Sequence, residues 1–312
     1  MTIPALYEVP DLPDEIVEAA KDGNLILFVG AGLSVQMKLP SWSGLAKLAL
    51  EDLRKEKIID YSELEQLLAL NDSKKQLTIA QIIADENSFD LDLAKHLNSD
   101  ADDEGIYRYV NDIGCSCVTT NYDNLLRPRY IDPNKPKGQT TPSTPDPVYR
   151  IDENLMSALN EPGTVIHIHG SIKEPSSMVV TTSDYLLHYD SDDLQYFLGE
   201  LFNKKTVLFI GYSLEESEVL EHILRRGGAR GVEAECRRFV LQGYFKSTTP
   251  LYHSLYKYYK HSFGVQLIGF DRDRHNYDQL EDILKRWSEL IEVRPQALVD
   301  RIKHIDEVLD RA

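Results

Sequence analysis

Six short runs of β-forming residues recur along the chain, and they are apolar on both faces. They are LILFVG at 25–30, CVTT at 117–120, TVIHIH at 164–169, TVLFIG at 206–211, RFVLQG at 238–243 and VQLIGF at 265–270. Strands that helices cover on both sides have this near-continuous apolar pattern. Stretches with helical periodicity separate the runs, so the sequence predicts an α/β fold with a mostly parallel sheet and helices on both faces.

The region after the first strand holds more helical sequence than a strand crossover needs. A helical stretch begins at Ser41, a suitable N-cap, and three more follow before the strand at Cys117. Because one helix suffices for a crossover, we expect a helical subdomain inserted at about 41–113 in a domain of residues 1–290. An amphipathic pattern near the end of the chain predicts a C-terminal helix within 291–312.

The charge and composition of the chain exclude several classes of protein. Its 312 residues carry 34 Lys and Arg against 51 Asp and Glu, a formal net charge of −17, which repels a phosphate backbone. We therefore expect no direct nucleic-acid binding. No apolar run approaches the roughly 18–20 residues that span a bilayer, so we expect no membrane partner. Three cysteines cannot form a disulfide framework in so long a chain, which fits a cytoplasmic location.

Residues 127–150 form a basic, proline-rich stretch in which we expect little regular structure. They hold six of the fourteen prolines, together with Arg127, Arg129, Lys135 and Lys137. The stretch is either a plain surface excursion or a lid or docking strip over a cleft, and its composition leaves both interpretations open.

Four of the predicted strands end in polar or glycine-rich clusters. The clusters are GAGLS at 30–34, TNYD at 120–123, HGS at 169–171 and GYS at 211–213. In an open parallel sheet, small molecules bind outside the carboxyl ends of the strands, so the four clusters should converge on one crevice. Their shared position is stronger evidence for a site than any one cluster.

The first two clusters each have a functional and a purely structural interpretation. Gly30 and Gly32 allow a tight turn and a close backbone approach, and Ser34 can donate to a pyrophosphate; a glycine turn without a ligand is the alternative. Asn121 can hold a sugar hydroxyl or a water, and Asp123 can accept from a hydroxyl or fix the loop. The alternative is an Asx turn that caps the next short helix.

The two later clusters supply an imidazole and a hydroxyl. His169, at the end of its strand, is a candidate general base, whereas His167 is expected to be a packed or hydrogen-bonded core residue. No third ligand stands at a recognisable spacing, so we predict no metal. Gly211 permits close approach, and Ser213 offers either a hydroxyl donor or a helix cap.

The order GAGLS, TNYD, HGS and GYS, each at a strand end, resembles the motif order of the sirtuin family. The resemblance spans roughly residues 24–215 by motifs and reaches about residue 270 by strands. It implies a Rossmann-like domain that holds NAD⁺ in the crevice as a substrate, cleaved at the bond between nicotinamide and ribose.

Three departures from the sirtuin pattern narrow this implication. No cysteine occurs between Cys117 and Cys236, so the zinc ribbon of deacylating sirtuins is not expected. KLPSWSGLA replaces the usual stretch after the first glycine turn, and VVTTSDY replaces the substrate-groove motif. These replacements resemble the sirtuin-like domains of bacterial anti-phage defence proteins, which consume NAD⁺ and stay silent until a partner or an infection signal releases them.

The resemblance implies a role for each matching residue. Asn121 would position the ribose face and the attacking water, Asp123 would support the loop, and His169 would act as the base toward a ribose hydroxyl or that water. The remaining positions that match the NAD-binding motifs are Gly30, Ala31, Gly32, Ser34, Thr120, Gly211 and Ser213.

The expected function is an NAD⁺ glycohydrolase that yields ADP-ribose and nicotinamide and acts as a defence effector. Its regulation is expected to come from homo-oligomerisation or from a separately encoded partner such as an ATPase, a helicase or an Argonaute-like protein. One alternative is a subunit that binds NAD⁺ or ADP-ribose without cleaving it. Others are a protein deacylase or ADP-ribosyltransferase, against which the missing zinc ribbon argues, and one component of a nucleic-acid-processing assembly.

Overall fold

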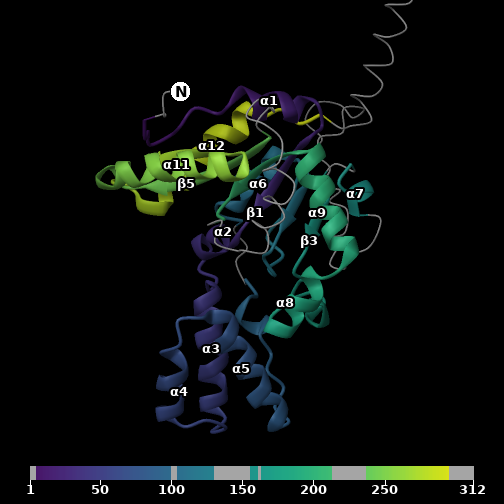
Figure 1. The fold of residues 1–312 in the computed structure, drawn as a ribbon, viewed down its shortest axis with the longest axis vertical. Helices are drawn as coiled ribbons and strands as arrows, with labels where there is room; N and C mark the ends of the chain where they lie inside the picture. Colours follow the sequence, from purple (N-terminus) through teal and green to yellow (C-terminus); the bar gives the residue numbers. More distant parts are fainter. Residues whose placement is uncertain (1–4, 100–103, 130–154, 161–162, 213–236, 295–312) are drawn as a thin grey trace, which may run out of the picture.

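The computed structural model describes residues 5–99, 104–129, 155–160, 163–212 and 237–294 (Figure 1). Its centre is a six-stranded, entirely parallel sheet with the strand order β3-β2-β1-β4-β5-β6. The strands are β1 Leu25–Val29, β2 Cys117–Thr119, β3 Val165–His167, β4 Thr206–Ile210, β5 Arg238–Tyr244 and β6 Val265–Asp271. This is the order of a doubly wound Rossmann fold, whose direction of winding reverses between β1 and β4. The predicted fold class and all six predicted strands are confirmed.

Both faces of the sheet are buried under helices, as the apolar strand sequences require. In β1 the alternate residues Leu25, Leu27 and Val29 join one core cluster, whereas Ile26 and Phe28 join the other. The helices in the first cluster are α1 Asp14–Lys21, α2 Ala31–Gln36, α6 Tyr107–Ile113 and α12 Gln279–Leu290. Those in the second are α7 Leu155–Ala158, α9 Asp192–Lys204 and α11 Thr249–Phe263.

Three helices form a unit with a hydrophobic cluster of its own, drawn in blue at the bottom of Figure 1. This helical unit comprises α3 Trp42–Lys55, α4 Tyr61–Leu68 and α5 Ser73–Glu86, followed by the 3₁₀ turn η1 Ala94–His96. Ser41 caps α3 as predicted, because its Oγ accepts from the amide of Gly44 at 3.2 Å. The helix α8 Thr182–Tyr189 lies beside the unit, and the hydroxyls of Thr78 and Thr182 are 3.1 Å apart. The remaining short turns are η2 Pro175–Ser177, η3 Lys246–Thr248 and η4 Asn276–Asp278.

Not every helix between 41 and 113 belongs to the helical unit. The side chains of Ile106, Tyr107, Val110 and Ile113 enter the core beside the sheet, where α6 packs against α12. The division of the chain into domains stays a prediction. The predicted C-terminal helix falls almost wholly outside the described residues, as does most of the proline-rich stretch. Among the helices of the described part, none combines the length and the apolar character that a bilayer crossing demands.

Candidate functional site

A cavity of about 640 Å³ lies at the carboxyl ends of the strands, within the range of about 300–1,000 Å³ that holds small molecules and cofactors. Each of the four predicted clusters contributes to its wall. The predicted site residues that line it are Ala31, Gly32, Ser34, Thr120, Asn121, Asp123, His169 and Gly211. Of the other two, Gly30 is buried behind the wall, and Ser213 lies outside the described residues.

Packing against the turn after β4 requires glycine in the turn after β1, whether or not a ligand binds there. A Cβ on Gly30 or Gly32 would stand 2.6 Å or 2.7 Å from the carbonyl oxygen of Gly211, the residue that follows β4. The amide of Gly32 already donates to that carbonyl at 2.8 Å. The two turns therefore interlock. The amide of Gly30 donates to the carbonyl of Ile210, so the amides of Gly30 and Gly32 are both used within the protein and are not free for a phosphate. Ala31 and Gly32 are themselves exposed on the cavity side of the turn.

Ser34, Asn121 and Asp123 form one buried hydrogen-bonded network. The Ser34 hydroxyl donates to Oδ2 of Asp123 at 2.7 Å, and Nδ2 of Asn121 donates to Ser34 Oγ at 3.0 Å. The other carboxylate oxygen, Oδ1, accepts from the amide of Leu125 at 3.1 Å, which is the Asx turn predicted as the structural alternative. Asp123 thus fixes its loop and a cavity residue at the same time.

A tyrosine that the sequence did not single out completes this network. The Tyr107 hydroxyl lies 3.0 Å from Ser34 Oγ and 3.2 Å from Nδ2 of Asn121. Burial, and after it the charge of Asp123, raises the pKa of Tyr107 well above its ordinary value, so the phenol stays protonated. Burial also raises the pKa of Asp123, although hydrogen bonds from Ser34 and the Leu125 amide oppose that effect.

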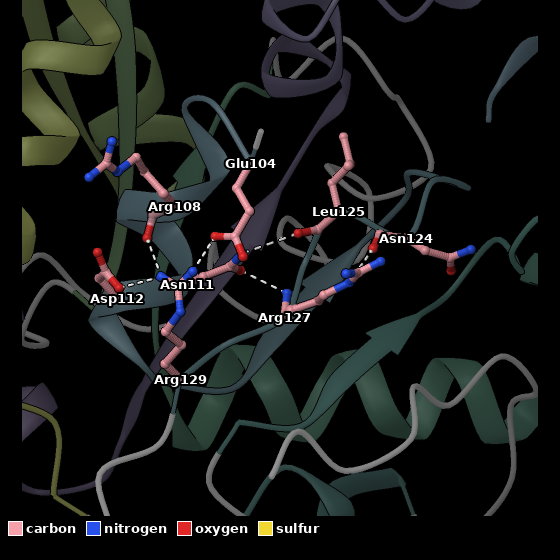
Figure 2. A network of polar contacts seen from close by, with 8 residues as sticks. All are labelled: Glu104, Arg108, Asn111, Asp112, Asn124, Leu125, Arg127 and Arg129. Carbon is pink, nitrogen blue, oxygen red and sulfur yellow. Dashed lines mark hydrogen bonds and ion pairs between the residues drawn. The ribbon is translucent and has the colours of Figure 1, made fainter. Parts of the chain in front are cut away.

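The helix that carries Tyr107 is tied to the segment that follows Asp123 (Figure 2). The Asn111 side chain donates to the carbonyl of Leu125 at 3.2 Å and accepts from the amide of Arg127 at 2.7 Å. Arg129 forms ion pairs with Glu104, which precedes α6, and with Asp112 near the end of that helix. These contacts of Asn111 and Arg129 fix the position of α6 relative to the loop after β2. They therefore also fix the network around Asn121, which both elements contribute to.

His167 is a core residue that holds the backbone of Asn121. Its Nδ1 lies 2.8 Å from the carbonyl oxygen of Asn121, so Nδ1 carries the proton and donates. Burial lowers the pKa of His167 to about 4, which keeps the ring neutral. The predicted hydrogen-bonded core role of His167 is confirmed.

His169 reaches the cavity from the turn after β3. Its Nε2 lies 2.8 Å from the hydroxyl of Tyr189 on α8, a residue that the sequence analysis missed, and its ring meets Tyr185 edge-on at 5.1 Å between centroids. Burial, and after it the charges of His188 and Lys74, lowers the pKa of His169 well below its ordinary value. A neutral imidazole that can accept a proton therefore faces the cavity.

The helical unit and α8 close the cavity beside His169. Trp42 stacks on Tyr122 with 6.0 Å between centroids and meets Tyr185 edge-on at 6.3 Å. The ammonium group of Lys74 lies 3.9 Å from the centroid of the Tyr185 ring. This corner of the cavity is aromatic with one cation, whereas the far end near β5 and β6 is lined by Gln242, Phe270 and other residues without charge.

No cluster of three or more His, Cys, Asp or Glu side chains that could hold a metal ion occurs in the part of the chain that the structure describes. The buried thiols of Cys115 and Cys117 are free, and Cys236 lies outside that part.

Comparison with known proteins relates the chain to one family. Residues 116–261, which include Asn121, Asp123 and His169, match the SIR2-like domain. The chain is 28% identical over 293 residues to the NAD(+) hydrolase ThsA of Enterococcus faecium, covering 88% of this chain and 53% of that protein. It is 29% identical over 224 residues to the protein of the same name in Bacillus cereus strain MSX-D12, covering 70% of this chain and 42% of the relative.

The chain also aligns with about a quarter of a longer relative. Over 313 residues the chain is 24% identical to the defense-associated sirtuin 2 of Bacillus subtilis, covering 95% of this chain and 28% of that protein. The chain thus spans about half or less of the length of the curated relatives it matches. Residues 116–261 thus match a SIR2-like domain, and the Rossmann sheet and the strand-end cavity agree with that match.

Proposed function

We propose that this chain is an NAD⁺ glycohydrolase, which cleaves the bond between nicotinamide and ribose and releases ADP-ribose. The observation that carries the proposal is the meeting of Asn121 and His169 in one cavity, beside the buried carboxylate of Asp123. Relatives named NAD(+) hydrolase that align over 88% and 70% of the chain support it.

The residues that line the cavity indicate how the dinucleotide lies. The chemistry must take place at Asn121 and His169, beyond β2 and β3, because these are the groups able to hold a ribose hydroxyl and accept a proton. The diphosphate then lies over Ala31 and Ser34, at the start of α2. The adenosine extends to the opposite end of the cavity, where Gly211 and Gln242 line the wall.

The reaction exchanges one bond at the anomeric carbon for another. The bond from C1′ to the pyridinium nitrogen breaks, and its electron pair neutralises the nicotinamide, while C1′ passes through an oxocarbenium-like state and takes the oxygen of water. His169, neutral because it is buried, accepts the proton that the water releases. Asn121 holds the ribose and the water in place, and correct placement of the reactants lowers the barrier to the reaction.

The biological setting belongs to the same proposal. We place the protein among defence effectors that deplete NAD⁺, with an assembly of its own copies or a separately encoded partner as the trigger. The similarity to a defense-associated sirtuin supports this setting. We also propose a cytoplasmic location, where the free buried thiols of Cys115 and Cys117 would stay reduced.

Incubation of the purified protein with NAD⁺, followed by chromatography of the products, tests the activity. Nicotinamide and ADP-ribose should appear in equal amounts, alone or after addition of neighbouring gene products. His169→Ala and Asn121→Ala should each reduce turnover about 100-fold or more, because each removes a group that touches the reacting atoms.

Matched controls are available on the surface of the same chain. His275→Ala and Asn87→Ala alter exposed side chains outside the cavity and should leave turnover unchanged. Unchanged turnover in His169→Ala would overturn the assignment of the base. Tight binding of NAD⁺ with no nicotinamide released under any activating condition would instead favour the non-catalytic binding subunit.

A further inference from the structure

The side-chain nitrogen of Asn121 donates to two protein oxygens. Nδ2 donates to Ser34 Oγ at 3.0 Å and to the hydroxyl oxygen of Tyr107 at 3.2 Å. Ser34 can accept because its own hydrogen goes to Asp123 at 2.7 Å. The network therefore presents two acceptors to one end of the amide.

This pattern distinguishes the two ways in which the amide can be turned. If the amide were reversed, its oxygen would face Ser34, whose hydrogen is already used, and Tyr107, which could supply one hydrogen bond at most. The observed orientation makes two bonds where the reversed one makes one. Removal of the Tyr107 oxygen would therefore remove half of the observed attachment.

The orientation leaves the other end of the amide without a partner among the residues that the structure describes. Oδ1 of Asn121 is buried and accepts no hydrogen bond from any described residue, although Asn121 itself lines the cavity. A buried acceptor without a partner is costly, so a site that keeps one is expected to satisfy it with a bound molecule. Donors of the right kind are a ribose hydroxyl and a water molecule.

The position of Tyr107 is itself well determined. The residue is fully buried, and α6 is held to the loop after β2 by Asn111 and Arg129, as Figure 2 shows. Its hydroxyl therefore stays at one place relative to Asn121. Tyr107 can orient the Asn121 side chain because its hydroxyl is held at a fixed position.

We propose that Tyr107 is a positioning residue that holds the Asn121 amide with Oδ1 available to the nicotinamide ribose or to the attacking water. The inference rests on the proposed hydrolysis for its catalytic consequence, but the orientation of the amide can be measured without turnover. Tyr107 touches neither the substrate nor the reacting atoms.

The test compares Tyr107→Phe with Tyr252→Phe. Tyr252 is also fully buried and does not line the cavity, so its variant controls for the loss of a buried phenol oxygen. Selective ¹⁵N labelling of asparagine, with the Asn121 signals assigned by their loss in Asn121→Ala, reports the exchange of the side-chain amide hydrogens with water. Thermal melting shows that each variant is folded.

In Tyr107→Phe the Asn121 amide hydrogens should exchange about tenfold faster, whereas Tyr252→Phe should match the wild type. For NAD⁺ cleavage, kcat should fall about tenfold with KM within about twofold, and the shape of the pH profile should not change, because the phenol acts as a fixed dipole. Unchanged exchange in Tyr107→Phe would overturn the inference whatever the activity. An altered pH profile would do so as well, since it would make Tyr107 an acid or base. If no form of the protein cleaves NAD⁺, the proposed function fails, and the exchange measurement still decides the orientation.

Discussion

The two halves of the cavity wall are built in different ways. On the amide side, Ser34, Asn121, Asp123 and Tyr107 are joined to one another by hydrogen bonds of 2.7–3.2 Å. On the imidazole side, the His169 ring has one side-chain hydrogen bond within the described part of the chain, to Tyr189, and is otherwise packed among aromatic rings. The first half is a polar network and the second an aromatic shell.

The difference also concerns which parts of the fold support each half. The amide side draws on α2, α6 and the loop after β2, which pack with the sheet, although Tyr122 of that loop also stacks on Trp42 of the helical unit. The imidazole side rests on α8, which contacts α5 of the helical unit through Thr78 and Thr182 and through Lys74 and Tyr185. The two halves therefore meet the helical unit through different contacts, His169 through α8 and Asn121 through its neighbour Tyr122.

Of the three variants that test this comparison, Tyr189→Phe is expected to have the largest effect. The variant removes the hydrogen bond to His169 but keeps the stacking of this ring on Tyr185, so kcat/KM should fall about five- to tenfold. Steady-state kinetics measure this fall, and Tyr196→Phe, which alters an exposed ring on α9, should show none. Exchange of the Asn121 amide hydrogens should not change in Tyr189→Phe. Faster exchange would contradict the separation of the two halves.

A smaller effect is expected from Asp52→Asn, inside the helical unit. Burial alone would raise the pKa of Asp52, but hydrogen bonds from three basic side chains outweigh it and lower the pKa to about 2. These partners are Lys95, His96 and Lys55. A carboxyl with a lowered pKa in the folded state stabilises the fold above its unfolded pKa of 3.8, and this contribution is lost as the pH falls toward 2.

Urea unfolding should therefore show Asp52→Asn to be about 1 kcal/mol less stable than the wild type at pH 7, after allowance for solvent screening of the exposed lysines. The deficit should persist down to about pH 4 and shrink below it. Glu86→Gln, an exposed carboxylate of α5, is the control and should have the same stability as the wild type. A deficit that does not depend on pH would mean that packing, not charge, is lost.

The smallest effect is expected from Lys74→Met. Burial lowers the pKa of His169 most, and the positive charge of Lys74 lowers it further, so removal of that charge should raise the pKa. Because His169 must be neutral to accept a proton, the acidic limb of the profile of kcat/KM against pH should move to higher pH. Activity should fall about twofold on that limb and stay unchanged on the plateau. A limb that moves to lower pH would contradict this sign.

The strands were predictable because their local sequence carries the whole signal. A run such as Leu25–Val29 is apolar at every position since both faces of the sheet are covered, and no distant residue is needed to recognise it. The convergence of Ser34, Asn121 and His169 on one cavity followed from topology, because parallel strands end at the same edge. The sequence could not decide whether Asp123 accepts from a hydroxyl or forms an Asx turn. The carboxylate has two oxygens and serves both.

Tyr107 and Tyr189 could not be found in the sequence. Each is one of seventeen tyrosines, and neither stands in a motif. Tyr107 lies 73 positions from Ser34, and the meaning of its hydroxyl depends on how α6 is tied to the loop after β2. The signal for α6 was present but ambiguous, since its amphipathic pattern suits a helix packed on the sheet as well as one in the helical unit.

The interlocked turns at Gly30, Gly32 and Gly211 show that a glycine-rich fingerprint in another sequence need not indicate ligand binding. Backbone of one turn occupies the space that a methyl group of the other would need, so alanine is excluded there even in a protein that has lost its ligand. Such a fingerprint would persist in a descendant that no longer binds anything. The polar side chains around it, free of that steric requirement, are the better record of whether binding survives.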